Sequence, residues 1–272
     1  ARVAPPSPER VVLIRQTVDA PFYLRCAGDA DGPPLVFVHG LGESGLGFEE
    51  LFEAPGLQRW QLLAPDLQGY GKSLPAERPL SLEEHATALA RWLDDRGLNE
   101  VTLVGHSMGG VIGQMLCEIE PGRIAGLVDV EGNITIEDCT FSSRAAAWSL
   151  EEFLDGGFRA LCNQLFDEAR DDPALRRYFV SMRICDPATL HRNARDLVEV
   201  SSQQTLAARL GALGVPVHYL WGDPRGTGQR SRQALQAAGI ACTPVPQSGH
   251  WPFLDQPESF LARLIDVLEA WH

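Results

Sequence analysis

The residues best suited to chemistry lie at positions 105–109, where the sequence GHSMG has the form G-x-S-x-G. An apolar run typical of a buried strand precedes it at 101–104, and a run typical of a helix follows at 111–119. A sharp turn between strand and helix exposes the serine hydroxyl, and the helix N-terminus favours a developing anion. The pattern therefore predicts that Ser107 is a nucleophile, whereas the bare motif also fits a surface serine in an ordinary turn.

A serine hydroxyl is a weak nucleophile until a base takes its proton. His250 follows the apolar run 240–245 and precedes the final helix that the sequence predicts. Because sites in α/β sheets lie beyond the carboxyl ends of the strands, His250 can reach the same edge as Ser107. His85 falls in a predicted helix and His218 in a predicted strand, so His250 is the expected base.

A developing oxyanion needs backbone donors at the same edge. The segment HGLG at 39–42 follows the apolar run 35–38. The N–H groups of Leu41 and of Met108, the residue after the nucleophile, are the expected donors, and each such donor contributes roughly 10²–10³-fold in rate. We expect His39 to brace this loop by hydrogen bonds and not to react.

The elements that must position these residues alternate along the chain. Ser81 and Glu84 form a capping box that opens a helix, and a second helix follows the serine. The alternation predicts a largely parallel sheet covered by helices on both faces. The expected strands are residues 11–14, 22–26, 35–38, 61–64, 101–104, 124–130, 215–221 and 240–245, and the later helices are 229–238 and one that begins near Pro257.

The segment 132–210 differs from the rest because it has helical spacing and no clear buried strand. We expect a helical cap there, inserted between core segments 1–131 and 211–272. The aromatic residues of this segment fit either an apolar ligand pocket or simply the core of the cap.

Four motifs resemble those of the α/β-hydrolase superfamily: HGLG at 39–42, DLQGYGKS at 66–73, GHSMGG at 105–110 and GHWPFLDQPE at 249–258. The resemblance implies the α/β-hydrolase fold, with an eight-stranded, mostly parallel sheet and a helical cap. It also implies a Ser–His–acid triad and an acyl-enzyme without metal or cofactor. Serine at position 107 argues against dehalogenase and epoxide hydrolase chemistry, for which related enzymes use an aspartate there.

The reaction that this resemblance favours is hydrolysis of a carboxylic ester or related acyl bond in a small, largely apolar substrate. Carbon–carbon bond hydrolysis, lactone or thioester hydrolysis and cyclisation use the same parts. A non-catalytic protein that binds an apolar ligand is a further alternative, because fold alone does not decide function.

The acid that orients His250 is the part of the triad with several candidates. The family usually places it about three residues beyond a glycine after the seventh strand, but Arg225 occupies that position. Glu131, at the end of the sixth strand, is favoured because some family members, including haloalkane dehalogenases, place a glutamate there. Asp223 and Asp129 are the alternatives.

A competing motif follows the strand at 35–38, where Gly40, Gly42 and Gly45 fit G-x-G-x-x-G and Asp66 ends the next strand. This combination is typical of a dinucleotide-binding site and would suggest an NAD enzyme. Two strands already precede the motif, no strong helix follows it at once, and Ser107 and His250 would be left unexplained. The NAD enzyme is therefore the weaker hypothesis.

Composition limits the partners of this 272-residue chain. The net charge is -13, from 23 basic and 36 acidic residues, so nucleic acid is not an expected partner. No run approaches the ~20 apolar residues of a membrane span, and no signal segment is visible at the N-terminus, which favours the cytoplasm. The six cysteines form no CxxC pair, so no metal site is expected, and we expect reduced, mostly buried thiols. A small-molecule substrate is the expected partner.

Overall fold

The computed structural model describes residues 12–272, and its centre is one eight-stranded sheet. The strand order is β1-β2-β4-β3-β5-β6-β7-β8. β2 pairs antiparallel with both of its neighbours, and every other pair is parallel. The strands are β1 (Arg15–Asp19), β2 (Phe22–Gly28), β3 (Pro34–Val38), β4 (Gln61–Asp66), β5 (Val101–His106), β6 (Ile124–Val130), β7 (Val217–Arg225) and β8 (Ala241–Gly249). The predicted α/β-hydrolase fold with a mostly parallel sheet is confirmed.

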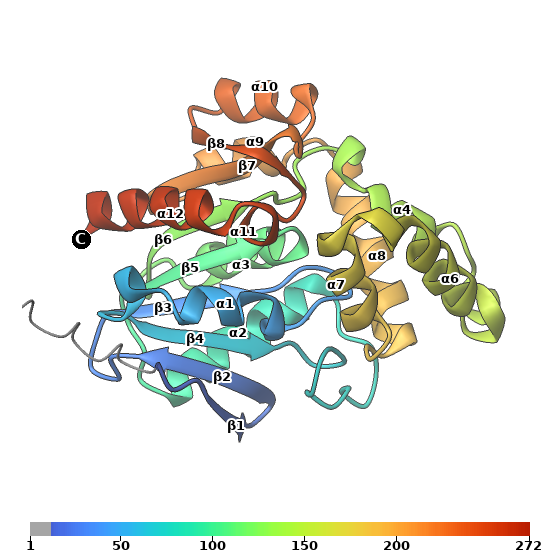
Figure 1. Ribbon diagram of the computed structural model, residues 1–272, viewed down its shortest axis with the longest axis horizontal. Helices are drawn as coiled ribbons and strands as arrows, with labels where there is room; N and C mark the ends of the chain where they lie inside the picture. Colours follow the sequence, from blue (N-terminus) through green and yellow to red (C-terminus); the bar gives the residue numbers. More distant parts are fainter. Residues whose placement is uncertain (1–11) are drawn as a thin grey trace, which may run out of the picture.

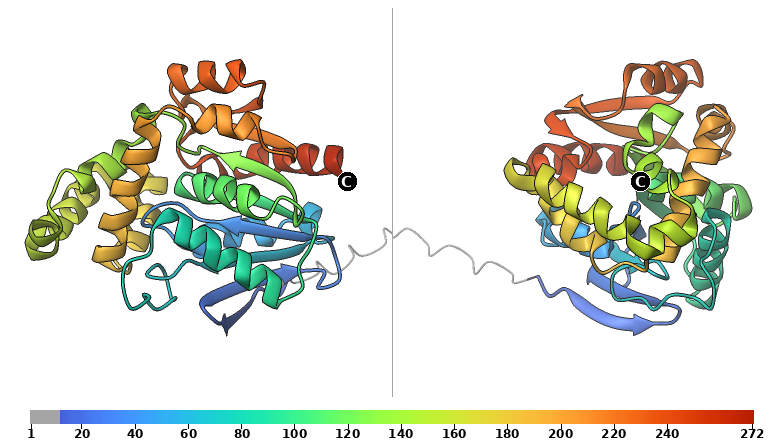
Figure 2. Two further views of the ribbon diagram at one scale, coloured as in Figure 1. Left: turned by 180° about the vertical axis from the view of Figure 1, so that it is seen from behind. Right: turned by 90° about the vertical axis from the view of Figure 1, so that its right-hand side faces the viewer.

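Helices cover both faces of this sheet (Figures 1 and 2): α2 and α3 lie on one face, and α1, α11 and α12 lie on the other. The α-helices are α1 (Glu49–Phe52), α2 (Leu82–Asp95), α3 (Met108–Ile119), α4 (Thr140–Ala146), α5 (Leu150–Glu152), α6 (Phe158–Glu168), α7 (Pro173–Met182), α8 (Pro187–Ser202), α9 (Leu206–Gly211), α10 (Gln229–Ala237), α11 (Pro252–Asp255) and α12 (Pro257–Trp271). Short 3-10 or π segments are η1 (Gly45–Phe48), η2 (Pro55–Leu57), η3 (Ile136–Asp138), η4 (Phe153–Gly157) and η5 (Ala169–Asp171).

Between β6 and β7 the chain forms only helical elements, α4–α9 with η3–η5, as the spacing of 132–210 predicts. Helices α4, α6, α7 and α8 lie beyond the carboxyl ends of the strands, on the right of Figure 1. They therefore stand over the sheet edge at which the candidate residues gather. Whether these helices form a cap separate from the core stays a prediction.

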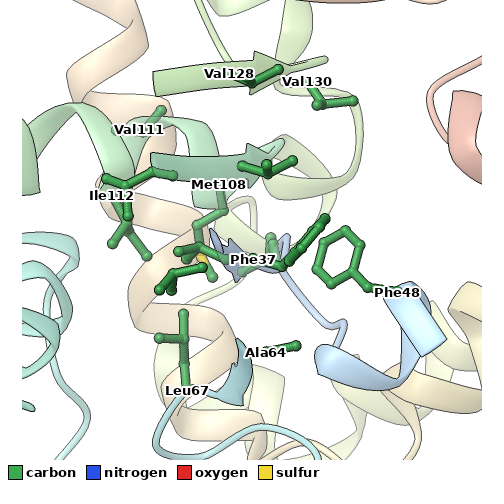
Figure 3. Close-up of a cluster of buried hydrophobic side chains, with 14 of the residues drawn as sticks. Phe37, Phe48, Ala64, Leu67, Met108, Val111, Ile112, Val128 and Val130 are labelled. Atoms are coloured by element: carbon green, nitrogen blue, oxygen red, sulfur yellow. The ribbon is translucent and has the colours of Figure 1, made fainter. Parts of the chain in front are cut away.

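The buried core fixes the start of α3 against the sheet. Met108 and Ile112 are fully buried, and Figure 3 shows Met108 beside Phe37 of β3 and both residues below Val128 and Val130 of β6. Such close packing leaves α3 no freedom to shift along the sheet. The residue immediately before this helix, Ser107, is therefore held at a fixed place.

Most elements lie where the sequence predicts, although β7 and β8 each end four residues later than expected, at Arg225 and Gly249. Two further differences concern whole elements. The first strand is Arg15–Asp19 and not 11–14, and Val11 lies outside the described residues. Strand β1 is exposed and has no buried face. An apolar run in the sequence therefore could not locate this strand. The structure also contains α11, a four-residue helix that begins two residues after His250 and that the sequence did not predict.

All six cysteines are free, and four of them are buried, as predicted. Within residues 12–272, no helix is both long and apolar enough to cross a membrane.

Candidate active site

Ser107 occupies the strained turn that the sequence predicts between β5 and α3. Its φ is 53° and its ψ is -118°, a backbone conformation that a residue with a side chain rarely adopts. Neighbouring glycines make the turn possible: a Cβ on Gly105 would lie 2.4 Å from the Gly109 carbonyl oxygen, and one on Gly109 would lie 2.0 Å from that of Val38. The turn leaves the Ser107 side chain in the wall of a cavity.

His250 lies at the other side of this cavity, one residue after β8 ends. Its Nδ1 is 3.3 Å from Oε2 of Glu131. If Nδ1 carries the proton and donates it to the carboxylate, Nε2 is left as an acceptor. Within residues 12–272, the structure contains no direct hydrogen bond from the Ser107 hydroxyl to His250. Such a bond is often long in a ligand-free site and tightens when substrate is present.

Glu131 is held by the backbone of the following strand. It has a φ of 54° and a side chain only 3% exposed. Its Oε1 accepts hydrogen bonds from the N–H groups of Gly222, at 2.7 Å, and Thr227, at 3.0 Å. A Cβ on Gly226 would lie 2.1 Å from the same oxygen, so glycine is required there for the carboxylate to fit. The carboxylate that contacts His250 is therefore that of Glu131.

The two alternative carboxylates are placed differently. Asp223 is exposed and has no side-chain hydrogen bond to another of the described residues. Asp129 is buried against Gly110 and Gly132, and its Oδ1 has no hydrogen-bond partner within the described chain. Burial, together with the nearby charge of Glu131, raises the pKa of Asp129 to about 8. A carboxyl group that is largely neutral and makes no hydrogen bond to His250 within the described residues cannot stabilise its imidazolium.

The loop after β3 carries the expected oxyanion donors. Leu41 lines the same cavity as Ser107, and Met108 is the first residue of α3, so its N–H has no acceptor within the helix. His39 braces the loop: Leu67 donates its N–H to Nε2 at 3.0 Å, and Nδ1 is 2.9 Å from the Gly40 carbonyl oxygen. Burial lowers the pKa of His39, which fits a neutral, structural side chain.

Two cavities meet at this edge. The one that Ser107 and His250 line has a volume of about 20 Å³, enough for roughly one water molecule. The second has a volume of about 680 Å³ and lies between α7 and the segment 43–50. Three residues line both cavities and separate them: Glu43, Tyr178 and Trp251. The aromatic rings of Tyr178 and Trp251 lie 5.3 Å apart.

Sequence reasoning missed one buried polar group beside the candidate triad. The carboxylate of Glu43 accepts hydrogen bonds from Trp251 Nε1 at 2.6 Å and from the Gly40 N–H at 2.8 Å, and it lies 2.9 Å from His106 Nδ1. A glutamate directly after the HGLG loop could have suggested a buried, hydrogen-bonded carboxylate, because a glutamate near a strand end is seldom buried without partners. Nothing in the spacing connects position 43 with position 106.

The dinucleotide hypothesis disagrees with the structure. The glycine-rich turn leads into η1 and α1, which have four residues each, and not into a long helix. Asp66 is fully buried, pairs with Arg25 at 2.6 Å, and accepts the N–H groups of Gly45 and Lys72 at 2.8 Å each. Its carboxylate is therefore occupied within the fold and cannot bind a ribose. Within residues 12–272, no group of three or more His, Cys, Asp or Glu side chains could hold a metal ion.

Comparisons with known proteins bear on the family and the fold. A relative from Serratia proteamaculans, 2-succinyl-6-hydroxy-2,4-cyclohexadiene-1-carboxylate synthase, is 27% identical over 249 residues, 89% of this chain and 95% of the relative. The solved structure of a thermophilic esterase from Thermogutta terrifontis superposes with a TM-score of 0.74 at 21% identity, covering 96% of this chain and 99% of the esterase. The N-acyl homoserine lactonase AidH superposes with a TM-score of 0.71 at 18% identity, covering 95% and 97%.

These two structures share the fold. The family comparison covers most of the chain, since the model of the alpha/beta hydrolase family matches residues 35–263. That range contains the serine turn, the histidine loop and the helices between β6 and β7. The chain belongs to the alpha/beta hydrolase family.

Proposed function

We propose that the protein is a serine hydrolase that cleaves a carboxylic ester or related acyl bond of a small, largely apolar substrate. One observation carries the proposal: Ser107, on a strained turn at the start of α3, lines the same small cavity as His250, whose Nδ1 lies 3.3 Å from Glu131. Nucleophile, base and orienting carboxylate are the three groups that acyl transfer requires.

In the proposed reaction, Ser107 Oγ attacks the carbonyl carbon and its proton passes to His250 Nε2. Glu131 stabilises the imidazolium that forms, and the N–H groups of Leu41 and Met108 bind the oxyanion. The bond to the leaving alcohol then breaks, and the alcohol takes the proton from His250, which leaves an acyl-enzyme. Water attacks this ester, gives its proton to His250, and releases the acid as Ser107 regains the proton.

The larger cavity supports an apolar substrate. Its volume of about 680 Å³ lies within the range of about 300–1,000 Å³ that is common for ligand pockets. Apolar side chains of both the core and α7 line part of it: Leu46, Val180, Phe253 and Leu254. Charged side chains line the rest: Glu43, Glu49, Glu50, Arg170, Asp171, Arg176 and Arg177. We propose that the apolar part of the substrate lies there, with the ester reaching Ser107 past Tyr178 and Trp251.

The charge around Ser107 favours a substrate that is neutral near its reacting bond. The charged side chains that line the small cavity are the carboxylates of Glu43 and Asp138, and no arginine or lysine lines it. The product named for the Serratia relative carries carboxylate groups, and these would find no cationic partner in this lining. Next to Ser107 an uncharged ester or lactone therefore fits better than an anionic group, whereas Arg170, Arg176 and Arg177 line the larger cavity and can bind an anionic group away from the reacting bond.

The test is release of p-nitrophenol from acetyl, butyryl and octanoyl esters, with a lactone as a further substrate. We expect turnover in the wild type and none in Ser107→Ala. Ser142→Ala is the matched control, because it removes a hydroxyl from the wall of the same cavity. Equal turnover in wild type and Ser107→Ala would refute the nucleophile. Absence of turnover and of covalent labelling by a fluorophosphonate in the wild type would instead favour a binding protein.

A further inference from the structure

A second carboxylate–histidine pair lies directly behind the first. His106, the residue before Ser107, is fully buried, and its ring centre is 4.9 Å from that of His250. Its Nδ1 is 2.9 Å from Glu43 Oε2, and its Nε2 is 2.7 Å from the backbone carbonyl oxygen of His250. Both ring nitrogens are therefore within hydrogen-bond distance of oxygen.

We infer that His106 is an imidazolium paired with the Glu43 carboxylate, and that this ion pair positions the base and the oxyanion loop around Ser107. A neutral imidazole has one donor nitrogen and one acceptor nitrogen. A carbonyl oxygen can only accept, so Nε2 of His106 must carry a proton. Nδ1 then either donates to a Glu43 carboxylate or accepts from a protonated Glu43.

The other bonds to Glu43 decide between these two forms. The Gly40 N–H donates to Oε2 and the Trp251 indole N–H donates to Oε1, and donors favour the ionised carboxylate. Burial works to raise the pKa of Glu43, but His106 and these two donors outweigh it and hold that pKa at about 2. Burial likewise works to lower the pKa of His106, but the charge of Glu43 outweighs it and the pKa is raised.

The other groups that face the pair come from three further elements. Glu131 and Asp129 lie at the end of β6. The charge of Glu131 favours a raised pKa of His106, and the charge of His106 favours a lowered pKa of Asp129. Tyr178 of α7 faces Glu43, and His250 lies against the ring. Apart from His250, whose protonation would oppose the cation, these groups are neutral or anionic. The surroundings therefore favour the imidazolium.

The pair joins the three segments that the proposed reaction needs. His106 is covalently bound to Ser107, its Nε2–H holds the backbone of His250, and Glu43 holds Gly40 beside the donor Leu41. Charge-assisted hydrogen bonds are about twice as strong as neutral ones, so this cluster restrains where each group sits. This positioning role rests on the proposed function, whereas the protonation state of His106 does not.

The protonation state is tested on the Ser107→Ala protein labelled with ¹⁵N-histidine. The His106 ring is identified by nuclear Overhauser contacts with Phe253, whose ring lies 4.9 Å away. We expect imidazolium ¹⁵N shifts at both nitrogens at about pH 7.5, at which a histidine with the ordinary pKa of about 6.5 is largely neutral. An unprotonated Nδ1 at this pH would overturn the inference, whatever the protein hydrolyses.

The positioning role is tested with His106→Asn, Glu43→Gln and the double variant, each checked for its fold by circular dichroism. Each single variant should lower kcat for p-nitrophenyl butyrate about 100-fold, because a small misplacement of reacting groups has that effect. KM should change little, and the double variant should lose no more than either single variant. Folded single variants that keep kcat within about threefold, or losses that multiply in the double variant, would refute it.

Hydrogen exchange provides a readout that does not need a substrate. Glu43→Gln should speed exchange of the Gly40 amide and the Trp251 indole N–H at least about tenfold, since both lose a carboxylate acceptor. The amide of Gly110, which bonds to the Ser107 carbonyl oxygen, should be unchanged. Unaltered exchange at Gly40 and Trp251 would refute the positioning role even if the protein hydrolyses no ester.

Discussion

The orientation of His250 by Glu131 can be tested by replacing the carboxylate with an amide of the same shape. In Glu131→Gln, one end of the side chain still faces the N–H groups of Gly222 and Thr227. The amide oxygen must take that end, because the reverse orientation would leave two buried donors without acceptors, at about 1–3 kcal/mol each. The amide NH₂ then faces His250 Nδ1, which must accept.

A proton excluded from Nδ1 moves to Nε2, the nitrogen that must take the proton of Ser107. The base is then present in the wrong tautomer. Loss of the corresponding carboxylate interaction in a serine triad lowers kcat by about 10⁴-fold, which corresponds to about 5.4 kcal/mol in the activation barrier. KM should change little, because no group that binds the substrate is removed.

The assay is steady-state hydrolysis of p-nitrophenyl butyrate, with Asp223→Asn and Asp129→Asn as controls. Both controls should keep kcat near the wild-type value, because Asp223 is exposed and Asp129 makes no hydrogen bond to His250 within the described residues. If Glu131→Gln retained more than about a tenth of the wild-type kcat, the tautomer reasoning would be wrong. A large loss in Asp223→Asn or Asp129→Asn alone would move the acid to that residue.

Three further predictions concern the surroundings of the site. Gly226→Ala should reduce kcat nearly as much as Glu131→Gln, since the new Cβ would lie 2.1 Å from Glu131 Oε1; a normal kcat would contradict this. Burial raises the pKa of Asp129 from 3.8 to about 8, so the folded state keeps a proton that the unfolded state has lost, and stability should fall as pH rises through this window. Urea unfolding of Asp129→Asn should lack that part of the decline. Tyr178→Leu should raise kcat/KM for octanoyl relative to acetyl esters about tenfold by joining the two cavities, whereas Tyr178→Phe should not.

The sheet and the serine turn could be predicted because local sequence determines them. Strand β6 has the predicted bounds, and α2 begins at the predicted capping box of Ser81 and Glu84. Both depend on residues close together in the chain. The first strand was misplaced because β1 is an exposed edge strand, in which few apolar residues mark the buried side.

The contacts around the triad could be predicted only in part. His250 and Glu131 follow strands, so topology alone brings them to one edge of the sheet. The pairing of Glu43 with His106 joins positions 63 residues apart, and neither residue belongs to a spacing pattern that links them. The separation of the two cavities by Tyr178 and Trp251 depends on how α7 packs on the core, which no local pattern specifies.

The proposed acid, Glu131, and the loop after β7 fit each other. A carboxylate at the end of β6 needs donors for its second oxygen, because a buried anion with unsatisfied lone pairs is costly. The chain after β7 supplies them as backbone N–H groups of Gly222 and Thr227, with Gly226 leaving room for the side chain. The Arg225 side chain is 65% exposed, and its Nη2 lies 3.8 Å from Asp255 Oδ2. The loop after β7 therefore binds the carboxylate of the proposed acid, and we expect an acidic residue introduced at position 225 to gain nothing while Glu131 remains.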